Sequence, residues 1–238
     1  KLRKTNYKRG WDYFNQFRND KNEDIIVIGD SHRFDFHQIL NASTIRNNFN
    51  IFQCTVRLIY FEENKNKKDY KIAREKNWIG KTEKCLKKIT KKKYKKIIIS
   101  YSFRDKDLDY LNSLLSFLND LGYAKDIILT SRFLSFEFDQ KGKTYLDSVL
   151  TNKEIEFDKI RDEKVMFKKI NINDYKINKK LKSLSKFYET EFFDKTSLQC
   201  NFFKKSCHII TNLNEKIYID ASPHLTLEGA KFFAIDVS

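Results

Sequence analysis

Long hydrophobic runs are missing from this sequence. No apolar stretch reaches the length of about 18 residues that a membrane-spanning helix needs, so the 238-residue chain contains no predicted transmembrane helix. It also lacks the basic start, apolar stretch and small-residue cleavage site of a signal peptide. It begins with Lys1 rather than methionine, which fits a mature product or an excised domain of a longer protein.

The sequence has only one proline and six glycines, whereas Lys, Asn, Ile, Phe and Tyr are abundant. Its net charge of +15 is compatible with nucleic-acid binding. However, the excess of lysine is part of the overall compositional bias of the chain and is spread over every segment. We therefore expect no specific nucleic-acid partner. An acidic glycan or an anionic membrane surface would fit the charge equally well. Hydrophobic residues make up 40% of the chain, enough for a sizeable core in one large domain or two small ones.

The four cysteines form no Cys-x-x-Cys pair, which leaves a zinc ribbon or a thioredoxin-like motif without support. Cys200 and Cys207 bracket the short stretch "QCNFFKKSC". A local disulfide there would imply an oxidising compartment. Two reduced cysteines in a cytosolic protein fit the spacing equally well.

Short apolar runs alternate with helix-compatible segments along most of the chain, which predicts an α/β fold with a mostly parallel sheet between two layers of helices. Strands are predicted at 25–29, 51–61, 95–102 and 125–131, and helices at 31–48, 79–93 and 105–123. We expect residues 1–24 to form a lead-in helix or linker. The remaining range, 25–238, is then one domain with an irregular insertion at about 139–185.

The first predicted strand runs directly into "GDSH", so Ser31 stands where ligands bind in a parallel α/β sheet. A serine here is either a helix cap or a nucleophile whose oxyanion the helix N-terminus would stabilise. A nucleophilic serine needs a base. Of the four histidines, His224 has a carboxylate shortly before it, Asp220, which could fix its tautomer. A capping or surface histidine is the alternative.

In this order, "GDSH" and "DASPHLTLEGA" resemble the SGNH (GDSL-like) hydrolase superfamily, and most closely the SGNH domains fused to membrane acyltransferases that O-acetylate surface polysaccharides. Those domains show "GDSH" early and "D-x-x-HLS/T-x-x-GA" late. They often carry a cysteine pair before the late block, where Cys200 and Cys207 stand here. The resemblance implies a three-layer α/β/α sandwich of the SGNH or flavodoxin-like type.

The resemblance also implies a site. Ser31 would be the nucleophile, His224 the general base and Asp220 its orienting acid, with the Ser31 backbone N–H in the oxyanion hole and no metal or cofactor required. From their position after the third strand, Ser102 and Arg104 are further oxyanion or substrate-binding candidates, although Arg104 can also simply pair with Asp105 or Asp107.

By the same resemblance, an acetyl group passes from an acyl donor to a glycan outside the cytoplasmic membrane, in the periplasm for example, with a membrane acyltransferase domain or partner delivering it. Acetyl-esterase activity would accompany the transfer. The sequence departs from the pattern in having three residues between Asp220 and His224 instead of two, and the superfamily's Gly and Gly-x-Asn-Asp blocks are not recognisable. A free-standing carbohydrate or lipid esterase, or a non-catalytic SGNH-like domain that binds glycan, are therefore the alternatives.

Overall fold

A computed structural model describes residues 23–137, 158–213, 215–219 and 224–237. Five parallel strands form one sheet in the order β2-β1-β3-β4-β5. The strands are β1 Glu23–Gly29, β2 Phe49–Thr55, β3 Lys96–Ser100, β4 Ile127–Thr130 and β5 Glu191–Phe193. The parallel α/β sheet expected from the sequence is thus confirmed.

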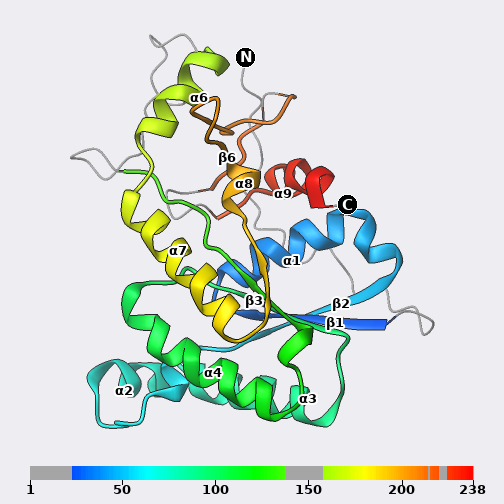
Figure 1. Ribbon diagram of the computed structural model, residues 1–238, viewed down its shortest axis with the longest axis vertical. Coiled ribbons are helices and arrows are strands. Elements are labelled where there is room, and N and C mark those ends of the chain that lie inside the picture. Colours follow the sequence, from blue (N-terminus) through cyan, green and yellow to red (C-terminus); the bar gives the residue numbers. More distant parts are fainter. Residues whose placement is uncertain (1–22, 138–157, 214, 220–223, 238) are drawn as a thin grey trace.

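Helices cover both faces of this sheet (Figure 1). The longer helices are α1 His32–Ala42, α2 Lys68–Glu75, α3 Trp78–Lys91, α4 Leu108–Asp120, α6 Lys159–Lys168, α7 Ile172–Phe187 and α9 Leu227–Ala234. The short helices are η1 Thr44–Asn47, η2 Leu58–Phe61, η3 Asp105–Asp107, η4 Ala124–Asp126, α8 Thr196–Gln199 and η5 Ile235–Val237. A two-stranded antiparallel ribbon joins β6 Cys200–Asn201 to β7 Ser206–Cys207.

Side-chain alternation along the central strands builds a separate core on each face of the sheet. Ile25 and Val27 of β1 pack in the cluster that includes α1 and α9, whereas Ile26 and Ile28 pack in the cluster that includes α3, α4 and α7. A strand buried on both faces needs a continuous apolar run, which "IIVI" provides. The three layers therefore follow from the β-branched strands that the sequence displays.

Several predicted boundaries differ from the structure. The second strand ends at Thr55, because the chain turns into η2 before residue 61. The predicted lead-in segment lies almost entirely outside the described residues. The range 139–185 was expected to be an insertion of helices and loops, and its described part holds α6 and most of α7, which precedes β5 at the sheet edge. Within the described ranges, no helix is long and apolar enough to cross a membrane.

Candidate active site

Ser31 lies between β1 and α1, at the carboxyl edge of the sheet. Its side chain makes no capping hydrogen bond to α1, so the helix-cap role considered from the sequence is not what the structure shows. Asp30 braces the turn instead, since its carboxylate accepts hydrogen bonds from the backbone N–H of His32 (2.9 Å) and of Ser102 (3.2 Å). The hydroxyl of Ser31 is consequently exposed and available for other contacts.

Gly29 lets this turn sit close to the neighbouring strand. Its φ is +154°, and a Cβ added here would collide with the carbonyl oxygen of Ser100 in β3. Only glycine permits this approach of the two backbones. The position of Ser31 is therefore fixed by backbone packing two residues earlier.

His224 reaches Ser31 from the other end of the chain. Its Nε2 lies 3.4 Å from Oγ of Ser31. An antiparallel bridge between Tyr218 and Leu225 and the hydrogen bond from Ile219 N–H to the His224 carbonyl (2.7 Å) hold the segment that bears the imidazole. Thr226 then caps α9 by accepting from the Gly229 N–H at 2.9 Å. The "HLTLEGA" motif thus combines a histidine with the start of a well-capped helix.

The carboxylate of Asp35 lies behind the imidazole. One oxygen is 2.8 Å from Nδ1 of His224, and the other accepts from the backbone N–H of Leu225 at 3.1 Å. Asp35 follows Ser31 by four residues at the start of α1, so both side chains lie on one face of the same helical turn. Burial raises the pKa of the Asp35 carboxyl, and the hydrogen bond with His224 opposes that rise. An ionised Asp35 holds the proton of His224 on Nδ1 and leaves Nε2 free to accept the serine proton.

His32 packs against this pair. Its ring stacks on that of His224 with centroids 4.3 Å apart and planes at 25°, and its Nδ1 lies 3.6 Å from the Asp35 carboxylate. Burial lowers the pKa of His32 to about 3, although the Asp30 carboxylate opposes that effect. A neutral imidazole therefore forms one wall beside His224 and fixes its ring plane without adding charge.

Serine, imidazole and carboxylate in this order are the arrangement that acyl transfer requires: a nucleophile, a base that accepts its proton, and an acid that orients the base. A family model for the SGNH domain (fused to AT3 domains) matches residues 4–236 of the sequence. The chain belongs to this SGNH family.

Two solved structures resemble this SGNH domain. The periplasmic domain of a lipopolysaccharide acetyltransferase from Salmonella ser. Paratyphi A aligns with a TM-score of 0.63 and 15% sequence identity, over 92% of this chain and 83% of that one. A GDSL-like lipase from Bacteroides thetaiotaomicron VPI-5482 aligns with a TM-score of 0.44 and 11% identity, over 94% and 89% of the two chains. No curated protein sequence matches the chain. The first of these likenesses supports the SGNH fold.

The structure brings together two of the residues expected from the sequence, Ser31 and His224, while Asp220 lies outside the described residues. Ser102 donates both its backbone N–H and its hydroxyl (3.0 Å) to Asp30, so it supports the turn that presents Ser31. Arg104 forms a two-pronged ion pair with Asp107 through Nε (3.1 Å) and Nη2 (3.2 Å). Cys200 and Cys207 are joined by a disulfide across the β6–β7 ribbon.

Sequence reasoning missed Asp35 and the second disulfide, between Cys54 and Cys85. The signal for Asp35 is its spacing of four residues from Ser31, one helical turn, on a helix that the sequence did predict. Cys54 and Cys85 stand 31 residues apart on β2 and α3, and nothing local in the sequence pairs them.

Lys195 is a further residue that the sequence reasoning did not single out. Its side chain is fully buried beneath the site, and its Nζ donates to Oγ of Ser100 at 3.1 Å. That hydroxyl in turn donates to the carbonyl of His32 at 3.3 Å. Burial lowers the pKa of Lys195 to about 7, and the carboxylates of Asp35 and Asp30 oppose the decrease. The floor of the site thus contains a cation whose charge changes near neutral pH.

His32, Asp35 and His224 are also the described residues that could hold a metal ion, with one ligand atom from each lying within 4.8 Å of the others. Two imidazoles and a carboxylate are a donor set that zinc accepts. The Asp35 carboxylate and His224 already satisfy each other in the SGNH domain, so a metal ion there would compete with the serine–histidine arrangement.

Proposed function

We propose that this domain is a serine-dependent O-acyltransferase that transfers an acetyl group to a bacterial surface glycan. Membership of the SGNH family supports an esterase or acyltransferase activity. The observation that carries the proposal is the contact of 3.4 Å between Ser31 Oγ and His224 Nε2, with Asp35 behind the imidazole.

In the proposed reaction, Ser31 Oγ attacks the carbonyl carbon of the acyl donor while His224 Nε2 takes the hydroxyl proton. The tetrahedral intermediate collapses to an acyl-serine, and the donor's leaving group departs with the proton from His224. A sugar hydroxyl then attacks the acyl-serine with His224 again as the base, which forms the new ester and restores Ser31. Asp35 stabilises the transient imidazolium, and the backbone N–H of Ser31 contributes to the oxyanion hole.

A small cavity lies beside the serine. It has a volume of about 30 Å³ and is lined by Ser31, Phe34, Gln38, Ile219 and His224, among others. This space can hold the methyl group of an acetyl. The choice of acetyl as the transferred group follows the resemblance to SGNH domains that O-acetylate surface polysaccharides. Water in place of the sugar would give the accompanying acetyl-esterase activity.

The family description, SGNH domain fused to AT3 domains, supports a membrane acyltransferase domain or partner as the source of the acetyl group. On this proposal the domain works at the periplasmic or extracytoplasmic face of the membrane. A free-standing esterase would use the same residues and differ only in the acceptor. A non-catalytic glycan-binding domain would not need its serine and histidine in contact.

Replacing the nucleophile tests the proposal. We expect Ser31→Ala to lower turnover of a small acetyl ester by roughly four orders of magnitude and to abolish labelling by a fluorophosphonate probe. Ser113→Ala, on the exposed face of α4, is the matched control and should change neither. Unchanged turnover and labelling of Ser31→Ala would refute the proposed chemistry. Acetyl transfer to a glycan, measured with a radiolabelled acetyl donor, separates the transferase from the esterase.

A further inference from the structure

A second, larger pocket includes Asp30, the residue that directly precedes the proposed nucleophile, in its lining. It has a volume of about 290 Å³ and lies at the carboxyl ends of β1, β2 and β3. Asp30, which directly precedes Ser31, forms part of its wall together with Arg57, Trp78, Tyr101 and Arg104. Its size suits one sugar residue better than an extended polymer.

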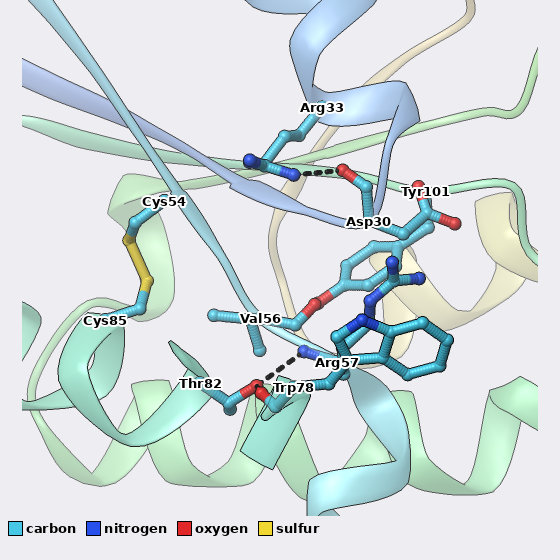
Figure 2. Close-up of a disulfide and its surroundings, with 9 residues drawn as sticks. All are labelled: Asp30, Arg33, Cys54, Val56, Arg57, Trp78, Thr82, Cys85 and Tyr101. Atoms are coloured by element: carbon cyan, nitrogen blue, oxygen red, sulfur yellow. Dashed lines mark hydrogen bonds between the residues drawn. A yellow bond between two sulfur atoms is a disulfide. The ribbon is translucent and has the colours of Figure 1, made fainter. Parts of the chain in front are cut away.

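The side chain of Arg57 lies against the ring of Trp78 in this pocket (Figure 2). Its guanidinium carbon lies 4.4 Å from the centroid of the Trp78 ring, a cation–π stacking distance. Its backbone N–H donates to Oγ1 of Thr82 in α3 at 3.0 Å. The Cys54–Cys85 disulfide joins the same two elements, β2 and α3. The strand that leads to Arg57 and the helix that begins at Trp78 are therefore cross-linked.

Arg57 is also the cation of this pocket without a carboxylate partner. Arg104 is paired with Asp107, and Lys106 with Asp69 at 3.1 Å. In the part of the chain that the structure describes, no carboxylate oxygen lies within 4.0 Å of Arg57, and its buried Nε has no hydrogen-bond partner.

The Asp30 carboxylate, the nearest acid by sequence to the nucleophile, accepts instead from His32 and Ser102. An arginine stacked on an aromatic ring presents its N–H edge as a planar fork that matches a carboxylate or phosphate. The pocket therefore offers one anion-binding group, the Arg57 guanidinium, that has no ion-pair partner among the described residues.

We propose that this pocket binds an anionic group of the acceptor glycan, a sugar carboxylate or a phosphate, through Arg57 backed by Trp78. The inference rests on the proposed function, because it assigns the acceptor class to the site that Ser31 serves. Arg57 fixes the sugar so that a neighbouring hydroxyl faces the acyl-serine. The charged rim excludes a hydrocarbon chain as the occupant, since Arg57, Arg104, Lys106 and Asp69 would all lose water to it.

The test measures binding without turnover. The chain has two tryptophans, Trp11 and Trp78, so Trp11→Phe in a Ser31→Ala background leaves Trp78 as the sole tryptophan, whose emission can be excited apart from that of the tyrosines. We expect an oligosaccharide bearing a carboxylate or a phosphate to change this fluorescence, and a neutral oligosaccharide of equal length to bind about tenfold more weakly or worse. Separate titrations with the carboxylate and phosphate ligands identify which anion the pocket takes. Binding should weaken as salt is added.

Three variants complete the test. Arg57→Gln should weaken anionic binding by about tenfold or more, and Arg57→Lys, which keeps the charge but loses the fork, should weaken it less. Arg74→Gln removes the same charge from the exposed surface of α2 and should bind like the parent. If Arg57→Gln does not fold, two other results still test the inference. One is the preference of the parent protein for an anionic over a neutral ligand, and the other is the weaker binding expected of Arg57→Lys.

Equal binding of neutral and anionic glycans, or unchanged binding by Arg57→Gln, would overturn the inference. Coenzyme A binding in preference to anionic glycans would also overturn it, because the anion would then belong to the donor. The experiments distinguish an error in the proposed anion-binding role of this pocket from an error in the proposed function. Fluorophosphonate labelling at Ser31 reports the chemistry without any glycan, and fluorescence of the Ser31→Ala background reports binding without any chemistry.

Discussion

The carboxylate of Asp35 lies 2.8 Å from Nδ1 of His224, although 189 positions separate the two residues in the sequence. Among the described residues, the helix that begins just after Ser31 therefore supplies an acid that contacts the base. Asp220, four residues before His224, is the acid that the sequence motif predicts. The two assignments make different predictions for mutants.

Asp35→Asn should lower kcat for acetyl-ester hydrolysis by roughly 10²–10⁴-fold, because an amide in place of the carboxylate no longer stabilises the imidazolium or fixes the productive tautomer. The asparagine keeps a similar shape and can still accept the Leu225 N–H bond, so we expect the fold to persist. Steady-state kinetics of the two variants Asp35→Asn and Asp220→Asn provide the measurement. A large loss for Asp220→Asn with little change for Asp35→Asn would reverse our assignment.

Lys195 should make stability depend on pH in an unusual direction. Burial lowers its pKa from 10.5 to about 7 in the folded protein. The unfolded chain therefore binds more protons at this position between those two pH values, and the free energy of unfolding rises with pH across that window. Lys195→Met removes the buried charge and should raise stability by about 1–4 kcal/mol below pH ~7. Its benefit should shrink toward pH ~10.

Urea unfolding of the parent and of Lys195→Met at pH ~6 and pH ~10 checks this prediction. Lys87→Met, on the exposed side of α3, is the control and should show no comparable gain at the lower pH. A destabilised Lys195→Met at pH ~6 would mean that the bond of Nζ to Ser100 outweighs the cost of burying the charge.

Gly29→Ala should damage both stability and activity. The new methyl group meets the Ser100 carbonyl, which forces β1 and β3 apart and displaces Ser31; overpacking of this kind costs about 1–3 kcal/mol. Gly122→Ala is the matched control, since its φ of +82° strains an alanine but no atom lies within 4 Å of the added Cβ. It should lose stability while kcat stays unchanged. Full activity in folded Gly29→Ala would show that the close approach does not position the serine.

The two disulfides should contribute unequally to stability. The Cys54–Cys85 link closes a loop of 31 positions and the Cys200–Cys207 link one of seven. On the chain-entropy model, replacing the first pair with alanine should cost about 3–4 kcal/mol and replacing the second about 2–3. Urea midpoints of the two double mutants test the order, and a larger loss for Cys200→Ala/Cys207→Ala would contradict it.

Zinc should inhibit rather than activate the enzyme. A zinc ion bound among His32, Asp35 and His224 would occupy the imidazole that accepts the serine proton in the proposed mechanism. We expect inhibition by added Zn²⁺ that EDTA reverses, less inhibition in His32→Phe, and no effect of Mg²⁺, which prefers oxygen ligands. Loss of activity with EDTA and recovery with Zn²⁺ would instead show a metal requirement.

The sheet was predictable because its central strands are short β-branched runs that need burial on both faces. The serine and histidine were predictable because their motifs are local: "GDSH" follows a strand and "HLTLEGA" begins a helix. Asp35 was missed because it lies within "HRFDFHQ", where an aspartate is also expected simply as a polar residue of an amphipathic helix. Only its contact with His224, which is distant in the sequence, distinguishes it. Helices were expected in the range that includes most of α7, but the bounds of α7 were not predicted, because the strand that follows it, β5, has only three residues.

The residues of the candidate active site come from two segments that are far apart in the sequence, and both segments must be present before the site can form. Ser31, His32 and Asp35 belong to one turn at the start of α1, so the packing of β1, β3 and α1 places these three residues together. Only His224 arrives separately, on the segment that leads into α9, and α9 packs so closely that Gly229 touches the backbone of Ile217. On the proposed mechanism, a chain that has not yet produced the segment bearing His224 contains the nucleophile and the acid but lacks the general base. We therefore expect no turnover until this segment docks against α1, so that turnover would report the assembly of the two parts of the site.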